Sequence, residues 1–102
     1  RNMKINIQFV NMQISEAMQA YTTKKVEKLS AKYPDIIHAD VFLKTENDPK
    51  GTGTICEIEL SLSGPRIFAS SNEKNYELAI KNTISDLEKQ LKKRKEIIKP
   101  YL

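Results

Sequence analysis

The sequence is poor in the residues that most often carry catalysis or bind metals. It has a single cysteine, Cys56, and a single histidine, His38. One cysteine excludes an internal disulfide and argues against a cysteine-based metal site. His38 stands two residues before Asp40 on a predicted strand, and two residues do not make a zinc site. We therefore interpret His38 as a surface residue.

Other marks of enzymatic chemistry are also missing. The chain has no glycine-rich phosphate loop. Cys56 falls in the apolar register of its strand, which predicts a small, buried core residue. Glu57 and Glu59 share a predicted strand face, but a solvated sheet face explains them more simply than a catalytic carboxylate pair. We expect no enzymatic activity, no cofactor and no bound metal.

Long hydrophobic runs are absent too. No stretch approaches the roughly 20 apolar residues of a membrane span, and no apolar signal-peptide core follows the first residues. We expect a cytoplasmic protein. The 102 residues, 39% apolar and 29% charged, predict one soluble, folded domain over residues 1–102. Arg1 and Asn2 precede a methionine and are left out of the predicted fold.

Hydrophobic periodicity predicts four strands and two helices. Apolar and polar residues alternate over residues 4–10, 37–44, 55–62 and, more briefly, 66–71. In the second of these, the apolar register begins at Ile37. Spacings of three and four predict helices with core-facing stripes. The first stripe is Met18, Tyr21, Thr22, Val26, Leu29 and Tyr33, and the second is Tyr76, Ala79, Ile80, Thr83, Ile84, Leu87 and Leu91.

Local signals mark where the predicted helices begin and end. Ser15 is a plausible N-cap of the first helix, and Pro34 and Asp35 end it. Pro100 stops the second helix.

The resulting order is strand, helix, three strands, helix. This order predicts an α+β fold, β-α-β-β-β-α, in which two helices pack on one face of a four-stranded sheet. A helix that joins two strands favours a right-handed crossover and a parallel pair. The later strands are expected to form antiparallel hairpins.

Positive charge gathers on the predicted helices. Residues 89–99 contain six basic side chains against Glu96, a local charge of +5. The first helix has four lysines (Lys24, Lys25, Lys28 and Lys32) against Glu27. At about 100° per residue, Lys74, Lys81, Lys92 and Lys99 fall near one direction of the last helix. Lys25 lies at the edge of the apolar stripe, where its ammonium can reach solvent.

Two interpretations of these lysines compete. Lysine-rich helix faces are usually solvated surface, and cations near a helix C-terminus complement the macrodipole. The outer sheet face, however, is expected to lean acidic through Asp40, Glu57 and Glu59 beside Lys44. Segregation of charge onto opposite faces favours a phosphate-rich partner, bound through counterion release. Lysines without base-reading companions indicate recognition of shape and backbone.

The helix sequences resemble a known family. Residues 21–29 (YTTKKVEKL), 75–80 (NYELAI) and 86–93 (DLEKQLKK) resemble the helix motifs of the ribosome hibernation promoting factor and ribosome-associated inhibitor A family. The resemblance covers nearly the whole chain from Met3. It implies a fold like that of double-stranded-RNA-binding domains. It also implies binding to ribosomal RNA of the small ribosomal subunit, in the messenger and transfer RNA channel, which silences ribosomes under stress or starvation.

The resemblance also assigns candidate RNA-binding residues. The family's RNA-facing positions correspond to Lys24, Lys25, Lys28, Lys89, Lys92 and Lys93. With the helical-wheel ridges, the full predicted set is Lys24, Lys25, Lys28, Lys32, Lys81, Lys89, Lys92, Lys93 and Lys99. Asp86 and Lys74-Asn75 depart from the family pattern. The short form of the family is the nearest likeness, and we expect a monomer in isolation, with no membrane or small-molecule partner.

Two alternative functions use the same predicted fold. One is general binding of double-stranded RNA outside the ribosome. The other is a protein-interaction module that uses the sheet face, where Phe42 and Ile55 fall on the outward register. Tyr21, Tyr33 and Tyr76 have core-stripe spacing, so we interpret them as packing residues and not as base-stacking platforms.

Overall fold

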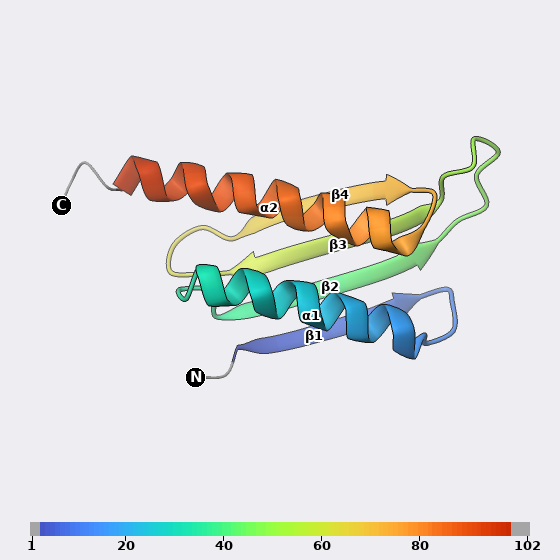
Figure 1. Ribbon diagram of the computed structural model, residues 1–102, viewed down its shortest axis with the longest axis horizontal. Helices are drawn as coiled ribbons and strands as arrows, with labels where there is room; N and C mark the ends of the chain where they lie inside the picture. The colour runs from blue at the N-terminus through green and yellow to red at the C-terminus, as the bar shows by residue number, and fades with distance from the viewer. Residues whose placement is uncertain (1–2, 99–102) are drawn as a thin grey trace.

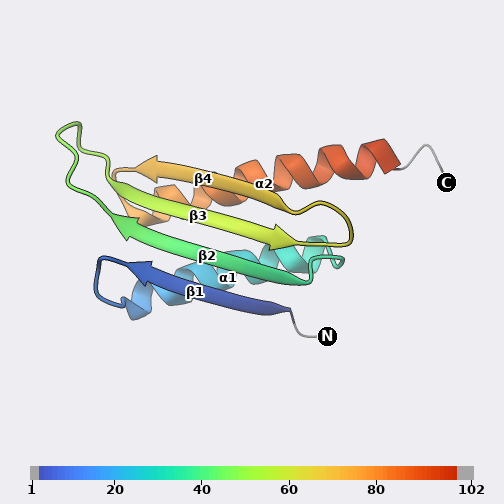
Figure 2. The ribbon, with the colours of Figure 1, turned by 180° about the vertical axis from the view of Figure 1, so that it is seen from behind.

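The computed structural model describes residues 3–98, and their side chains as far as Lys95. The chain runs through β1 (Lys4–Val10), α1 (Glu16–Lys32), β2 (His38–Thr45), β3 (Thr54–Ser61), β4 (Ile67–Glu73) and α2 (Tyr76–Ile98). Both helices lie on one face of the sheet and leave the other face open (Figures 1 and 2). The predicted β-α-β-β-β-α fold is confirmed.

The sheet has the order β1-β2-β3-β4. β1 pairs parallel to β2, with Ile7 opposite Val41, and the other two pairings are antiparallel. The parallel pair and the hairpins are therefore as predicted. The chain reverses direction twice between β2 and β4, so β4 runs parallel to β1. These two outermost strands therefore have their C-terminal ends at the same end of the sheet.

The helix starts have local causes. Ser15 caps α1, because its Oγ accepts a hydrogen bond of 3.3 Å from the Met18 backbone N–H. Asn75 does the same for α2, where its Oδ1 accepts from the Leu78 N–H at 2.8 Å. The first helix ends at Lys32, just before Tyr33 and Pro34, as predicted. Pro100, the predicted stop of the second helix, lies outside the described residues.

The core lies between the sheet's inner face and the two helices. Its fully buried members include Val41 and Leu43 of β2, Ile58 of β3, and Ile80 and Leu87 of α2. Cys56 is also buried, and burial raises the pKa of its thiol to about 11. The apolar stripes predicted for the two helices are the faces of α1 and α2 that pack against the core.

Two buried threonines keep their hydroxyls hydrogen-bonded. The Thr22 Oγ1 donates to the Met18 carbonyl at 2.7 Å. The Thr83 Oγ1 lies 2.8 Å from the Ala79 carbonyl and 3.3 Å from the Cys56 carbonyl, so it links α2 to β3. Both stripes therefore include a polar residue whose hydroxyl is satisfied.

The start of the second strand differs from the prediction. Ile37 was expected to face the core, but its side chain is 60% exposed, whereas Ile36 is 1% exposed. The chain turns after α1, where the Ile36 N–H donates to the Tyr33 carbonyl at 3.2 Å. The strand begins only at His38, so Ile36 fills the core position from within the turn.

Two further boundaries also differ. Lys74 was placed on the last helix, but it precedes α2 and lies in the bend after β4. β4 covers Ile67–Glu73, slightly later than the predicted residues 66–71.

The described residues lack two kinds of feature. None of their helices is long and apolar enough to cross a membrane. Within the same part of the chain, no three histidine, cysteine, aspartate or glutamate side chains are grouped to hold a metal ion.

Candidate nucleic-acid interface

The two helices lie side by side and run in the same direction (Figure 1). Near their N-terminal ends, the rings of Tyr21 and Tyr76 meet edge to face, with centroids 5.9 Å apart and planes at 86°. Further along, Lys32 of α1 reaches Glu88 of α2. The shared direction follows from the sheet. α1 follows β1 and α2 follows β4, and these two parallel strands have their C-terminal ends at the same end of the sheet.

The predicted lysines of α1 all lie on the flank that turns toward α2 or on the neighbouring outer surface. Tyr21, Lys25, Lys28 and Lys32 follow one another at spacings of four, three and four, and the first and last of them contact α2. Lys24 lies next to Lys28, one turn earlier, and is exposed. The four lysines therefore form a ridge along the boundary between the helices.

The predicted lysines of α2 spread from that boundary to the outer surface. At about 100° per residue, Lys81 and Lys92 share the flank of Glu88, which faces α1. Lys89 points outward, and Lys93 lies further round the helix. All four are exposed. Lys99 lies outside the described residues.

Most of these amines are not neutralised by a neighbour. Among the described residues, no carboxylate lies within 4.0 Å of seven of the predicted lysines. We call these seven the lysine face: Lys24, Lys25, Lys28, Lys81, Lys89, Lys92 and Lys93. Within it, the Lys25 Nζ lies 5.4 Å from the centroid of the Tyr21 ring, a cation–π contact that leaves its charge intact.

Lys32 is different, because it is held in an ion pair. Its Nζ donates to Glu88 at 2.5 Å, and the Tyr33 hydroxyl lies 3.5 Å from the same carboxylate oxygen. The hydrogen bond from Lys32, with help from the charge of Lys92, holds the pKa of Glu88 below its usual range. The same hydrogen bond raises the pKa of Lys32. Its role in RNA binding stays a prediction.

Two further basic residues of α2 contribute to the local charge of +5 but differ in what their side chains contact. Arg94 was counted in the local charge of +5, but its guanidinium donates to the carbonyls of Ser63 and Pro65 in the turn before β4. It serves the fold. Lys95, which was not among the candidates, is exposed three residues beyond Lys92. Its position one turn along the helix is the signal that would have identified it.

The open sheet face is close to neutral, which corrects the expected acidic lean. Glu57 pairs with Lys44 at 3.1 Å, and Glu59 pairs with Arg66 at 3.5 Å. The Asp40 Oδ1 lies 3.0 Å from the His38 Nε2. Lys4, opposite His38 in the sheet, adds a positive charge that the prediction left out. Positive charge is therefore concentrated on the helices, while the other face is balanced.

The apolar residues of the open face are few. Phe42 and Ile55 are half-buried on the outward register, as predicted, and Phe68 is 53% exposed. Phe42 lies opposite Glu57 in the ladder and Phe68 lies opposite Glu59, so charged residues of β3 stand between the two rings. The Phe42 and Phe68 rings are therefore not joined into one apolar patch.

The chain matches known sequences over nearly its whole length. Residues 5–99 match the family described as Sigma 54 modulation protein / S30EA ribosomal protein. The ribosome hibernation promoting factor of Escherichia coli (strain K12) is 33% identical over 99 residues, which cover 97% of this chain and 100% of that protein. The factor of the same name from Salmonella typhimurium (strain LT2) is 30% identical over 99 residues, with the same coverage.

Solved structures show the same fold. A ribosomal subunit interface protein from Coxiella burnetii superposes with a TM-score of 0.81 at 22% identity, covering 92% of this chain and 99% of that one. The N-terminal domain of Thermus thermophilus Protein Y gives a TM-score of 0.74 at 25% identity, covering 91% and 98%. The family predicted from the helix motifs is thus confirmed. The chain belongs to the Sigma 54 modulation protein / S30EA ribosomal protein family.

Proposed function

We propose that this protein is a hibernation factor that binds the small ribosomal subunit through ribosomal RNA and blocks the messenger and transfer RNA channel under stress. The observation that carries the proposal is the lysine face. Two parallel helices bring seven lysines together, and none of them has a carboxylate partner among the described residues. The sequence relatives are named ribosome hibernation promoting factor, which supports the hibernation role.

The physical basis is neutralisation of RNA phosphates. Each lysine that replaces a condensed counterion makes binding entropically favourable and sensitive to salt. Lysine is a flexible point charge and lacks the fixed pairs of donors and acceptors with which arginine, asparagine and glutamine read base edges. We therefore expect recognition of RNA shape and backbone. The protein acts in the cytoplasm by occupancy, so it needs neither turnover nor cofactor.

The test is co-sedimentation with purified small ribosomal subunits over a series of salt concentrations. We expect stoichiometric binding whose logarithmic affinity falls steeply with the logarithm of salt. Failure of the folded protein to bind at low salt would refute the proposal. A free RNA duplex that competes as well as ribosomal subunits would instead favour general double-stranded RNA binding.

The first prediction locates the binding surface. Changing Lys89, Lys92 and Lys93 together to alanine should weaken binding and flatten the salt dependence by about one unit of slope for each phosphate that is no longer neutralised. The matched control changes Lys4, Lys50 and Arg66 to alanine, which removes the same charge from residues outside the lysine face. Equal losses of affinity in both triple variants would mean that net charge, and not this surface, determines binding.

A further inference from the structure

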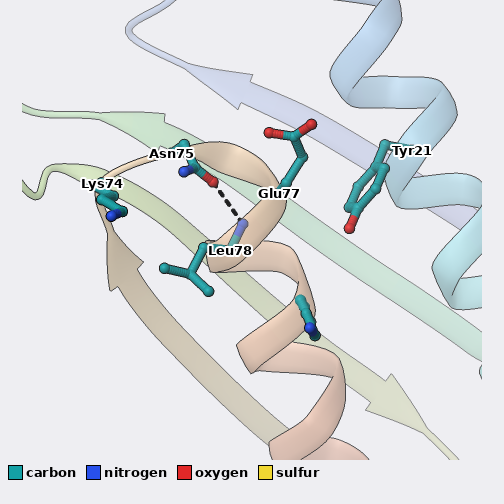
Figure 3. A pocket seen from close by; sticks show the side chains of 6 residues that line it. Tyr21, Lys74, Asn75, Glu77 and Leu78 are labelled. Carbon is teal, nitrogen blue, oxygen red and sulfur yellow. Dashed lines mark hydrogen bonds between the residues drawn. The ribbon is translucent and has the colours of Figure 1, made fainter.

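A shallow pocket of about 520 Å³ lies at the N-terminal end of α2, on the side of the neighbouring α1. Six residues line it: Tyr21, Lys74, Asn75, Glu77, Leu78 and Lys81. Figure 3 shows Tyr21 on one side and Lys74 on the other, with Glu77 between them. The pocket adjoins the lysine face, because Lys81 belongs to both.

The lining offers three kinds of contact in one place. The spacing of Tyr21 predicts a packing residue, and its ring does pack edge to face with Tyr76, but it is only half-buried. The part of Tyr21 that lines the pocket and the half-buried Leu78 supply apolar surface. Glu77 is exposed and supplies an anionic acceptor. Lys74 and Lys81 are exposed, and neither forms an ion pair with a described residue.

This combination matches the chemistry of a nucleotide. RNA-binding proteins recognise unpaired bases by packing them against aromatic rings and by hydrogen bonds to the Watson–Crick edge. A carboxylate accepts two parallel hydrogen bonds, and guanine is the base whose edge offers two adjacent N–H donors, the ring imino group and the exocyclic amine. The two lysines supply positive charge for the attached phosphates.

We propose that this pocket binds an unpaired guanine nucleotide of an RNA strand. The base packs against Tyr21 and Leu78, Glu77 accepts from its Watson–Crick edge, and Lys74 and Lys81 contact the neighbouring phosphates. An RNA strand is favoured over a free nucleotide because Lys25 and Lys28 continue the positive surface along α1, beyond the reach of one nucleotide. The inference rests on the proposed function, and it adds a base preference to a surface that otherwise recognises backbone.

The test compares short RNA strands on the isolated full chain. Binding of the pentamers UUGUU and UUUUU is measured by NMR chemical-shift titration at low salt. We expect the guanine strand to bind about tenfold more tightly, as one charge-assisted contact allows. We also expect shifts that centre on the amides of residues 21 and 74–81. Equal affinities of the two strands would overturn the proposal, as would shifts confined to the C-terminal half of α2.

The decisive variant is Glu77→Gln, which keeps the size of the side chain and removes its charge. It should reduce the preference for UUGUU to less than about twofold, even if the removal of negative charge raises affinity for both strands. The control is Glu16→Gln, because Glu16 is also an exposed acid in the first turn of a helix and lies outside the pocket. An unchanged preference in Glu77→Gln, or the same loss in Glu16→Gln, would refute the role of Glu77.

Two further arms separate the possible failures. Guanosine 5′-monophosphate should bind at least tenfold more weakly than UUGUU, and equal binding would overturn the assignment to an RNA strand. Co-sedimentation of the Glu77→Gln variant and of the wild type with small ribosomal subunits tests the proposed function separately. Both proteins should sediment with the subunits, because Glu77 is not part of the lysine face. Retained sedimentation of the wild type with no guanine preference in the pentamers would overturn the pocket proposal alone.

Discussion

Glu88 limits the positive charge that the helices present. Its carboxylate accepts from Lys32 at 2.5 Å, lies 3.5 Å from the Tyr33 hydroxyl and feels the charge of Lys92. A phosphate that approached Lys32 would have to replace this carboxylate as its partner. One residue therefore lowers the positive charge that the helices offer to the proposed RNA ligand, and it also joins the two helices.

Changing Glu88 to glutamine should strengthen binding to ribosomal subunits by several-fold and steepen its salt dependence. The reason is that Lys32 becomes free to contact a phosphate. The measurement is co-sedimentation at several salt concentrations. The control is Glu27→Gln, because Glu27 is exposed on α1 and has no ion-pair partner among the described residues. Weaker binding of Glu88→Gln than of the control would contradict this role.

The same variant should be less stable than the wild type at neutral pH. The pKa of Glu88 is lowered in the folded state, mainly by the hydrogen bond from Lys32. Its contribution is therefore present above the unfolded-state pKa and is lost as the pH falls through the lower folded-state value. Urea denaturation at pH 7 and at pH 3 measures this. A stability difference that does not shrink at pH 3 would rule out ionised Glu88 as its source.

Among the elements, α2 is tied to the sheet at several points along its length. Asn82 donates to Glu73 at 3.0 Å, Gln90 donates to the Phe68 carbonyl at 2.9 Å, and Arg94 donates to the turn before β4. That turn contains Gly64 at φ +98°, and a Cβ there would lie 2.8 Å from an Arg94 nitrogen. These contacts hold the edge of α2 that faces β4, while Lys81 and Lys92 lie on the flank of Glu88 that faces α1.

Arg94→Lys should lower the free energy of unfolding by about 1 kcal/mol, because a lysine cannot donate to two carbonyls with the fixed fork of a guanidinium. It should also speed amide hydrogen exchange at Ser63, Gly64 and Arg66, the residues of this turn that have a backbone N–H. Arg66→Lys is the control, since Arg66 is 67% exposed and 3.5 Å from Glu59, and an exposed pair contributes little. Equal destabilisation by both variants would argue against the role of Arg94.

At the scale of the whole molecule, the order of the strands and helices places the lysine face on one side and the paired charges of the sheet on the other. Because β1 and β4 run the same way, the helices that follow them return in the same direction, and both lie on one face of the sheet (Figure 1). The lysines of two segments far apart in the sequence are therefore carried on the same side of the molecule. The open face seen in Figure 2 pairs its charges internally. Among the described residues, positive charge is thus concentrated on the side of the helices.

Removing the charges of two acids on the open face should therefore leave RNA binding almost unchanged. The double variant Glu57→Gln, Glu59→Gln raises the net charge by two units, yet ribosome affinity should change by less than about twofold at physiological salt. The molecule extends 18 Å along its shortest axis, on which the helices lie over the sheet. This is about twice the Debye length of about 8 Å at physiological salt, so charges on opposite faces are largely screened from each other. The measurement is co-sedimentation with ribosomal subunits, in which this double variant is compared with the wild type and with Glu88→Gln. Loss of binding would instead indicate a protein contact on the open face.

The sequence by itself determined the elements and their order. Period-two and period-3.6 patterns are local, so β1, the buried stripes of α1 and α2, the Ser15 cap and the outward register of Phe42 and Ile55 could all be predicted. The helix motifs also sufficed for the family. Eight of the nine predicted lysines lie in the described residues, on the two helices as expected.

Only the tertiary structure decided what those side chains meet. Lys32 and Glu88 are 56 residues apart, Arg94 and Ser63 are 31 apart, and the pocket joins Tyr21 to the start of α2. Ile36 took the core place expected for Ile37 because a turn, not a strand, precedes β2. Periodicity orders side chains within one element, whereas these contacts depend on how separate elements approach, and that is set by packing around the shared core.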